Sequence, residues 1–190
     1  MSTARMMSLR PALGPRGKLW LKGLHITFSV VWLGTAICMN VLRFAWMPAV
    51  DGERYAVDQT VVLLDEWVMI PSALGALLTG ALESWLTTWG FFEYRWVTVK
   101  WIVTVALMLY APVFQAQWAK EMASISRVEG LMALQNAAYV RFWRQYAGSG
   151  VLMILALASL PMVSSVKPWM RRDRSRASGK TGTAAGRPSG

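Results

Sequence analysis

The sequence predicts an all-α integral membrane protein in which four helices cross the bilayer. Of the 190 residues, 55% are hydrophobic and only 16% are charged, whereas a soluble domain has about 45–50% apolar and about 25% charged residues. Four long apolar segments follow one another along the chain. Backbone groups have no water to bind inside the hydrocarbon core, so each segment must satisfy its own hydrogen bonds. Segments of this length do so as helices.

The first predicted span covers residues 19–46. It is long enough, because a crossing takes roughly 20 mainly apolar residues at a rise of about 1.5 Å each. It also contains the polar residues Lys22, His25 and Asn40. Most of the polar residues in this span and in the next lie toward the span ends, where side chains reach headgroups or water.

The second predicted span covers residues 61–89 and contains small residues at intervals of four. This small-residue stripe consists of Ser72, Ala76, Gly80 and Ser84. Such a stripe lets another helix approach closely, so it predicts a helix-packing face. A homodimer along the same stripe is a further expectation. Pro71, Pro112 and Pro161 each fall within one span and predict kinks, because neighbouring helices or hydroxyl groups can bind the freed carbonyls.

The third and fourth predicted spans, residues 96–119 and 147–166, carry almost no charge. The segment between them, residues 120–146, is predicted to be a loop. Its residues 131–146 could lie in the headgroups as an amphipathic helix.

Basic residues concentrate in two flexible tails, residues 1–17 and 171–190, that flank a membrane domain of residues 18–170. Loops rich in Lys and Arg stay in the cytoplasm, so both termini are predicted to be cytoplasmic. The first loop is acidic and suits the opposite side. The net charge of +10 does not indicate nucleic-acid binding, because the charges flank apolar spans and no recognition helix is visible.

Three ionisable residues from three predicted helices, His25, Glu83 and Lys100, are expected to form a polar cluster near the inner interface. The second and third helices would form a hairpin, which brings Glu83 and Lys100 to similar depth. Charges inside a membrane are costly and are therefore candidates for function. Three roles stay open: a structural ion pair, separate contacts of each charge with headgroups, or a site for a ligand or proton transfer.

His25 is the only histidine of the chain. Its imidazole could be bound by a neighbouring group or by interfacial water, or it could ligate haem iron. Ligation by two histidines of one chain is impossible, so a second axial ligand would have to be a methionine, with Met39, Met69, Met108 and Met153 as candidates. No carboxylate lies at metal-ligand spacing from His25, so no other metal site is expected. No serine or cysteine has an evident base beside it, so nucleophilic catalysis has no candidate.

The segments LWLKGLHITFSVVWLGTAI, MIPSALGALLTG, YRWVTVKWIVTVALML and VSSVKPWMRR resemble a bacterial family of predicted integral membrane proteins of unknown function, over about residues 18–172. More distantly, an early histidine in the first helix, a second helix with Pro and Gly, and a W-x-x-x-K motif on the third resemble the HemJ-type four-helix membrane protoporphyrinogen oxidase. This resemblance implies that His25 is a haem ligand and Lys100 an electrostatic or proton-handling partner.

Two functional hypotheses follow. The first is a non-enzymatic four-helix membrane protein in which His25, Glu83 and Lys100 order the bundle and bind a small ligand. The second is a haem-linked membrane oxidoreductase, with His25 and Lys100 at the cofactor. The sequence leaves open whether the protein is an enzyme.

Overall fold

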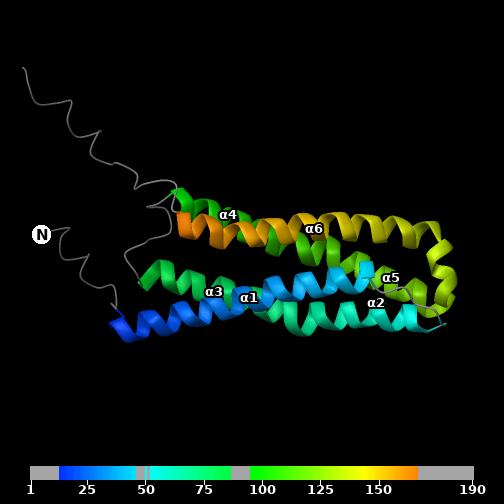
Figure 1. Cartoon of the computed structure of the whole chain (residues 1–190), viewed down its shortest axis with the longest axis horizontal. Helices are drawn as coiled ribbons and strands as arrows, with labels where there is room; N and C mark the ends of the chain where they lie inside the picture. The colour runs from blue at the N-terminus through cyan, green and yellow to red at the C-terminus, as the bar shows by residue number, and fades with distance from the viewer. Residues whose placement is uncertain (1–12, 46–49, 51, 87–94, 167–190) are drawn as a thin grey trace, which may run out of the picture.

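The computed structural model of the protein describes residues 13–45, 50, 52–86 and 95–166, and these form an elongated helical bundle (Figure 1). The elements in chain order are α1 (Pro15–Ala45), α2 (Glu53–Leu64), η2 (Asp65–Met69), α3 (Ile70–Leu86), α4 (Arg95–Tyr110), η3 (Ala111–Gln115), α5 (Ala116–Glu129), η4 (Gly130–Gln135) and α6 (Ala137–Val166). Four helical stretches are long and apolar enough to cross a membrane: Pro15–Ala45, Glu53–Leu86, Trp96–Gln135 and Ala137–Ser165. The predicted fold class is therefore confirmed.

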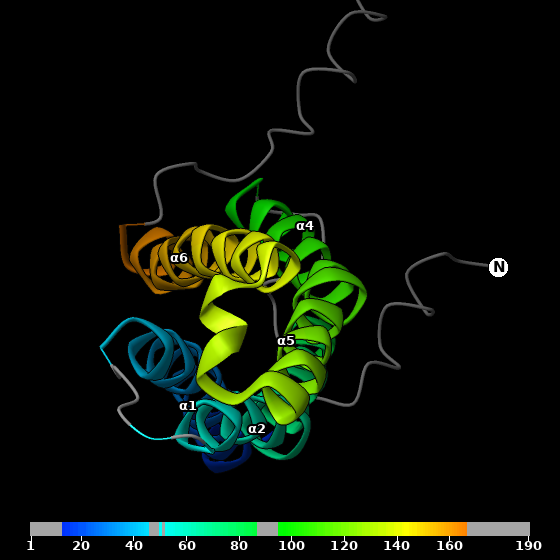
Figure 2. The same cartoon turned by 90° about the vertical axis from the view of Figure 1, so that its right-hand side faces the viewer.

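The bundle has two ends, which we call the terminal end and the far end (Figure 1). At the terminal end, α1 begins, α3 ends, α4 begins and α6 ends. At the far end, α1 ends, α2 and α5 lie side by side, and η4 crosses from α5 to the start of α6 (Figure 2). The four membrane-crossing stretches alternate in direction. The start of α1 and the end of α6 therefore lie at the same end of the bundle.

Helix α1 packs along α3, on the stripe of small residues that the sequence predicts as a packing face. Ser72, Ala76 and Ser84 are buried there, and a Cβ atom at Gly80 would lie 3.1 Å from the His25 ring. The packing role of the stripe is thus confirmed. Because α1 covers the stripe, a homodimer, which stays a prediction, would have to use another surface.

Two of the three prolines lie at π-helical turns. Proline has no N–H group, so it leaves a carbonyl one turn earlier without its usual donor, and a wider turn can accommodate the change. Pro71 is the second residue of α3, two residues after the end of η2. Pro112 lies inside η3, where the backbone N–H of Ala116 binds the carbonyl of Ala111. Pro161 lies within continuous α6. None of the three prolines breaks its helix, as predicted.

The helices are longer than the predicted spans, and most of the additional length lies at the far end. The span predicted at 61–89 begins at Glu53, the third continues to Gln135, and the fourth begins at Ala137. Residues 46 and 87–89 of the predicted spans lie outside the described residues.

The predicted loop at residues 120–146 is therefore wrong: it consists of helix α5, the 3₁₀ helix η4 and the first third of α6. Nor do residues 131–146 form a helix lying across the headgroups, because Ala133, Tyr139 and Tyr146 are buried in the bundle core. The helices continue here because α5 packs against α2 and buries Ala119, Met122 and Ala123.

The predicted tails, residues 1–17 and 171–190, lie almost entirely outside the described residues. Helix α1 begins before the predicted start at residue 19, with Pro15 in its first turn. Proline suits that position because the first N–H groups of a helix have no partner within it.

Candidate functional site

A pocket of about 390 Å³ lies at the terminal end of the bundle. Helices α1, α3 and α4 contribute most of its walls, and α6 contributes Ser164. The pocket brings together the three residues of the predicted polar cluster, His25, Glu83 and Lys100. Two further lysines of α1, Lys18 and Lys22, lie on the exposed rim. The remaining wall is largely apolar or aromatic, with Leu77, Trp96, Val97 and Trp101 among its residues.

The side chain of His25 is held by α3. Its Nδ1 atom lies 3.0 Å from the carbonyl oxygen of Ala76 and 3.0 Å from Oγ1 of Thr79. The hydroxyl of Thr79 donates its own proton to a backbone carbonyl, with Oγ1 at 2.6 Å from the oxygen of Gly75. Both groups therefore act as acceptors toward His25.

These contacts assign the tautomer of His25. Because Nδ1 faces two acceptors, it carries the proton, and the neutral imidazole then has its lone pair on Nε2. His25 lines the pocket, so Nε2 can accept a hydrogen bond from a bound molecule or ligate a metal. Gly80 makes room for the ring, because a Cβ at this position would lie 3.1 Å from Cε1 of His25.

Lys100 lies on α4, one turn after Trp96, and its Nζ atom is 5.9 Å from the centre of the Trp96 ring. A lysine over an aromatic face gains a cation–π attraction at about this distance. The charge of Lys100 interacts with that of Glu83 on α3, and both charges act on His25. The three side chains, which come from three different helices, are thus close enough to interact electrostatically.

The pocket offers two kinds of polar group to a ligand. Lys18, Lys22 and Lys100 supply ammonium donors, whereas Glu83 and Nε2 of His25 supply acceptors. The volume falls in the range of small-molecule sites, about 300–1,000 Å³, and the mixture of apolar walls with a few polar groups is typical of them. The arrangement can therefore bind a small molecule that is anionic and has an apolar part.

The described residues do not form the ligand set of a metal centre. Within the described ranges, no group of three or more His, Cys, Asp or Glu residues could hold a metal ion. The methionines considered as second axial ligands to a haem do not line the pocket. Met39, Met69 and Met153 are buried in the hydrophobic core, and Met108 packs against it.

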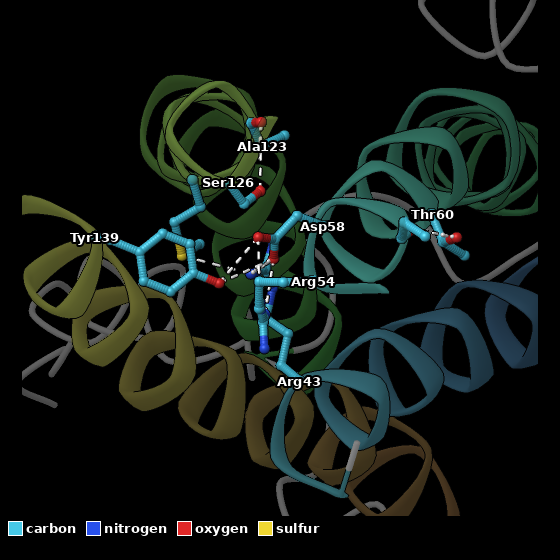
Figure 3. Close-up of polar contacts among 9 residues, drawn as sticks. Arg43, Arg54, Asp58, Thr60, Ala123, Ser126 and Tyr139 are labelled. Atoms are coloured by element: carbon cyan, nitrogen blue, oxygen red, sulfur yellow. Dashed lines mark hydrogen bonds and ion pairs between the residues drawn. The ribbon is translucent and has the colours of Figure 1, made fainter. Parts of the chain in front are cut away.

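The far end contains a buried ionic network that the sequence analysis missed (Figure 3). Asp58, with no exposed surface, accepts hydrogen bonds from Arg43 of α1 at 3.0 Å and from Arg54 of its own helix at 2.8 Å. The hydroxyl of Tyr139, on α6, donates to the same carboxylate at 2.9 Å. One carboxylate thus connects three helices.

Both arginines are also packed against aromatic rings. The guanidinium of Arg43 lies 4.3 Å from the centre of the Tyr146 ring, and that of Arg54 lies 5.4 Å from the Tyr139 ring. The sequence predicts that Arg43, Arg54 and Asp58 belong to the acidic first loop, whereas the structure buries all three in helices α1 and α2. The one available signal was the spacing of Arg54 and Asp58, four residues apart, which places them on the same face of a helix.

The four apolar helical stretches define the class of this protein, which is a multi-pass membrane protein. Comparisons of the chain with family models, with curated proteins and with solved structures gave no match. Assignment of a function therefore depends on the geometry of the pocket.

Proposed function

We propose that this protein is a bacterial inner-membrane protein that binds a small ligand in the terminal-end pocket. The observation that supports this most directly is the convergence of His25, Glu83 and Lys100, from three helices, on one pocket. A purely structural ion pair would need only two of these residues and no cavity. The fixed orientation of the His25 ring also favours a binding role, since its Nδ1 contacts leave Nε2 for a ligand.

The charge distribution supports a cytoplasmic position for the terminal end. The described residues of the far end include equal numbers of acidic and basic side chains: Glu53, Asp58, Asp65, Glu66, Glu121 and Glu129 with Arg43, Arg54, Lys120, Arg127, Arg141 and Arg144. Among the residues whose side chains the structure describes, the terminal end has Arg16, Lys18, Lys22 and Lys100 with only Glu83, and the chain continues into two basic tails. An excess of Lys and Arg marks the cytoplasmic side.

The first test is the substitution Lys100→Met. Protein extracted in mild detergent is expected to carry a co-purified molecule, seen as added mass on the intact protein. Loss of one charged contact should weaken binding about 10-fold, because hydrogen bonds to charged groups contribute about 1.5–3 kcal/mol. Intact-protein mass spectrometry measures the occupied fraction.

Lys120→Met is the matched control, because Lys120 lies at the far end and pairs with Glu66 on the surface. This variant should keep full occupancy. Equal occupancy in the two variants, or wild-type protein with no bound molecule under any extraction condition, would contradict the proposal.

A haem-linked oxidoreductase is the second candidate, and the tautomer of His25 is the observation that favours it. A histidine whose Nδ1 is hydrogen-bonded to the backbone presents Nε2 in the form that ligates haem iron. His25 would supply one axial ligand, and the pocket lysines could bind the carboxylates of the porphyrin. When bound, a haem would supply one-electron chemistry. The pocket fits this cofactor incompletely, because none of the methionines in the described ranges lines it.

Absorption spectra of protein from haem-replete cells decide between the two candidates. Haem ligation by His25 would give a Soret band that disappears in His25→Ala and persists in Met39→Leu, since Met39 lies in the core and not in the pocket. A colourless wild-type protein would remove the haem candidate and leave the small-ligand proposal standing.

A further inference from the structure

The pocket lies where two pairs of helices separate. Helix α1 packs along α3, and α4 packs along α6, but α4 has little contact with α3 although it follows α3 in the chain. At the terminal end the ribbons of the two pairs lie apart (Figure 1), and residues of both pairs line the pocket between them. In a membrane, such a pocket between α3 and α4 borders on lipid.

The outer surfaces of these two helices are apolar next to the pocket. On α3, Leu78 and Leu82 are exposed, and on α4, Val99 and Ile102 are exposed. Leu77 of α3 and Val97 of α4 line the pocket itself. Apolar side chains thus lie both in the pocket and on the adjoining surfaces of α3 and α4. A ligand with hydrocarbon chains could keep its chains in lipid while its polar part occupies the pocket.

The polar groups indicate the chemistry of that part. Among the described residues that line the pocket, Lys18, Lys22 and Lys100 outnumber the carboxylate of Glu83, so a ligand with a net negative charge balances the excess positive charge better than a neutral or zwitterionic one. Lysine is a common phosphate ligand as a compact point charge. Lys18 and Lys22 are one turn apart on the exposed rim of α1, where both ammonium groups can reach one phosphate.

The hydrogen-bond acceptors of the pocket, on His25 and Glu83, favour a ligand that carries hydrogen-bond donors. His25 offers a lone pair on Nε2, and the carboxylate of Glu83 has about four lone-pair sites, enough to accept a ligand hydroxyl beside its contacts within the protein. An anion made only of phosphate oxygens has no donor for these groups. A phosphate that carries a hydroxylated substituent satisfies both the lysines and the acceptors.

We propose that the terminal-end pocket binds the headgroup of an anionic glycerophospholipid that bears hydroxyl groups, such as phosphatidylglycerol. Its phosphate contacts Lys18, Lys22 and Lys100, its hydroxyls donate to Glu83 and His25, and its acyl chains leave between α3 and α4. This inference rests on the proposed function and names the ligand class of the same site. A soluble phosphate ester shares the headgroup chemistry and is the competing source.

The experiment titrates detergent-purified protein with four probes and counts bound molecules by intact-protein mass spectrometry. The probes are phosphatidylglycerol, phosphatidylcholine and phosphatidylmethanol with identical acyl chains, and glycerophosphoglycerol, which has the headgroup without chains. Wild-type protein is expected to bind phosphatidylglycerol about 10-fold more tightly than phosphatidylcholine, a difference of about 1.4 kcal/mol. The lysines attract the net negative charge of the phosphatidylglycerol headgroup, whereas the choline group of phosphatidylcholine cancels that charge. Phosphatidylmethanol, with the same charge and no hydroxyl, should bind more weakly than phosphatidylglycerol.

The double variant Lys18→Met, Lys22→Met should bind phosphatidylglycerol and phosphatidylcholine about equally. Both lysines are exposed, so this variant should fold. The matched control is Arg141→Met, Arg144→Met, which removes two exposed basic residues of α6 at the far end and should keep the 10-fold preference.

Several results would overturn the inference. Equal affinity of wild-type protein for phosphatidylglycerol and phosphatidylcholine, or an equal loss of preference in the two double variants, would show that the pocket does not select an anionic lipid. Equal binding of phosphatidylmethanol would remove the role of Glu83 and His25 as hydroxyl acceptors. Glycerophosphoglycerol binding as tightly as the lipid would assign a soluble ligand, and the small-ligand function would then stand without the lipid.

Discussion

Asp58→Ala is expected to lower the melting temperature of the detergent-purified protein by roughly 10 °C or more. The substitution removes the carboxylate that forms ion pairs with both Arg43 and Arg54, which are each only 2% exposed. Removing one partner of a buried ion pair costs about 3–5 kcal/mol, because the remaining charge stays in a medium of low polarity. Each kcal/mol shifts the melting temperature by about 2–4 °C in a chain of this length.

A second reason to expect a large loss of stability in Asp58→Ala is the environment of Arg43. Within the described part of the chain, Nε and Nη2 of Arg43 have no hydrogen-bond partner, so its hydrogen bond to Asp58 matters more. Tyr139 would also lose the acceptor of its hydroxyl. Thermal unfolding followed by tryptophan fluorescence measures the effect.

Glu66→Ala is the control for this experiment. Glu66 forms an ion pair with Lys120, with Oε1 at 2.8 Å from Nζ, but both side chains are about half exposed. Exposed ion pairs contribute only about 0–1 kcal/mol to the free energy of unfolding. Its melting temperature should stay within a few degrees of wild type. If the Asp58→Ala and Glu66→Ala variants have the same melting temperature, the ionic network around Asp58 does not stabilise the bundle.

Gly150→Ala is expected to destabilise the protein by about 1–3 kcal/mol, whereas Gly148→Ala on the same helix should be neutral or stabilising. A Cβ atom at Gly150 would lie 2.5 Å from Oδ1 and 2.8 Å from Nδ2 of Asn40, a buried side chain on α1. Asn40 cannot move freely because its Nδ2 donates to the carbonyl of Ala36 at 2.9 Å. Forcing an extra atom into such a contact has about this cost.

The comparison isolates the contact between α1 and α6. Alanine has a better helix propensity than glycine by about 0.8–1.0 kcal/mol at either position, and a Cβ at Gly148 would have no neighbour within 4 Å. The difference between the two unfolding midpoints therefore reports the clash with Asn40. Similar midpoints for both variants would mean that α1 and α6 are not in close contact at this position.

The two ends of the bundle have different physical roles. At the far end, Asp58 draws α1, α2 and α6 together, and its carboxylate accepts hydrogen bonds from Arg43, Arg54 and Tyr139. At the terminal end, α3 and α4 separate, and the charges of Lys18, Lys22 and Lys100 surround a pocket. A bundle fixed at one end and open at the other is suited to ligand binding at the open end.

The hydrophobic pattern was enough to predict the membrane-spanning part of the fold. Charge-free runs such as residues 147–166 have no alternative to a helix in lipid, and the spacing of Ser72, Ala76 and Ser84 predicted the face on which α1 packs. The cluster of His25, Glu83 and Lys100 could also be placed on one level, because the depth of a residue in a membrane helix follows from its distance along the span.

Where the chain leaves the hydrocarbon core, hydropathy no longer distinguishes a helix from a loop. Residues 120–146 and 53–60 contain many charges, and only the packing of α2 against α5 and of Tyr139 on Asp58 keeps them helical. The same reason applies to the site. The hydropathy pattern predicted that three ionisable residues lie at one depth in the membrane. Interhelical packing decides the rotation of each helix, the contacts that orient His25 and the separation of α3 from α4. These features could not be predicted because such packing joins residues that are far apart in the sequence.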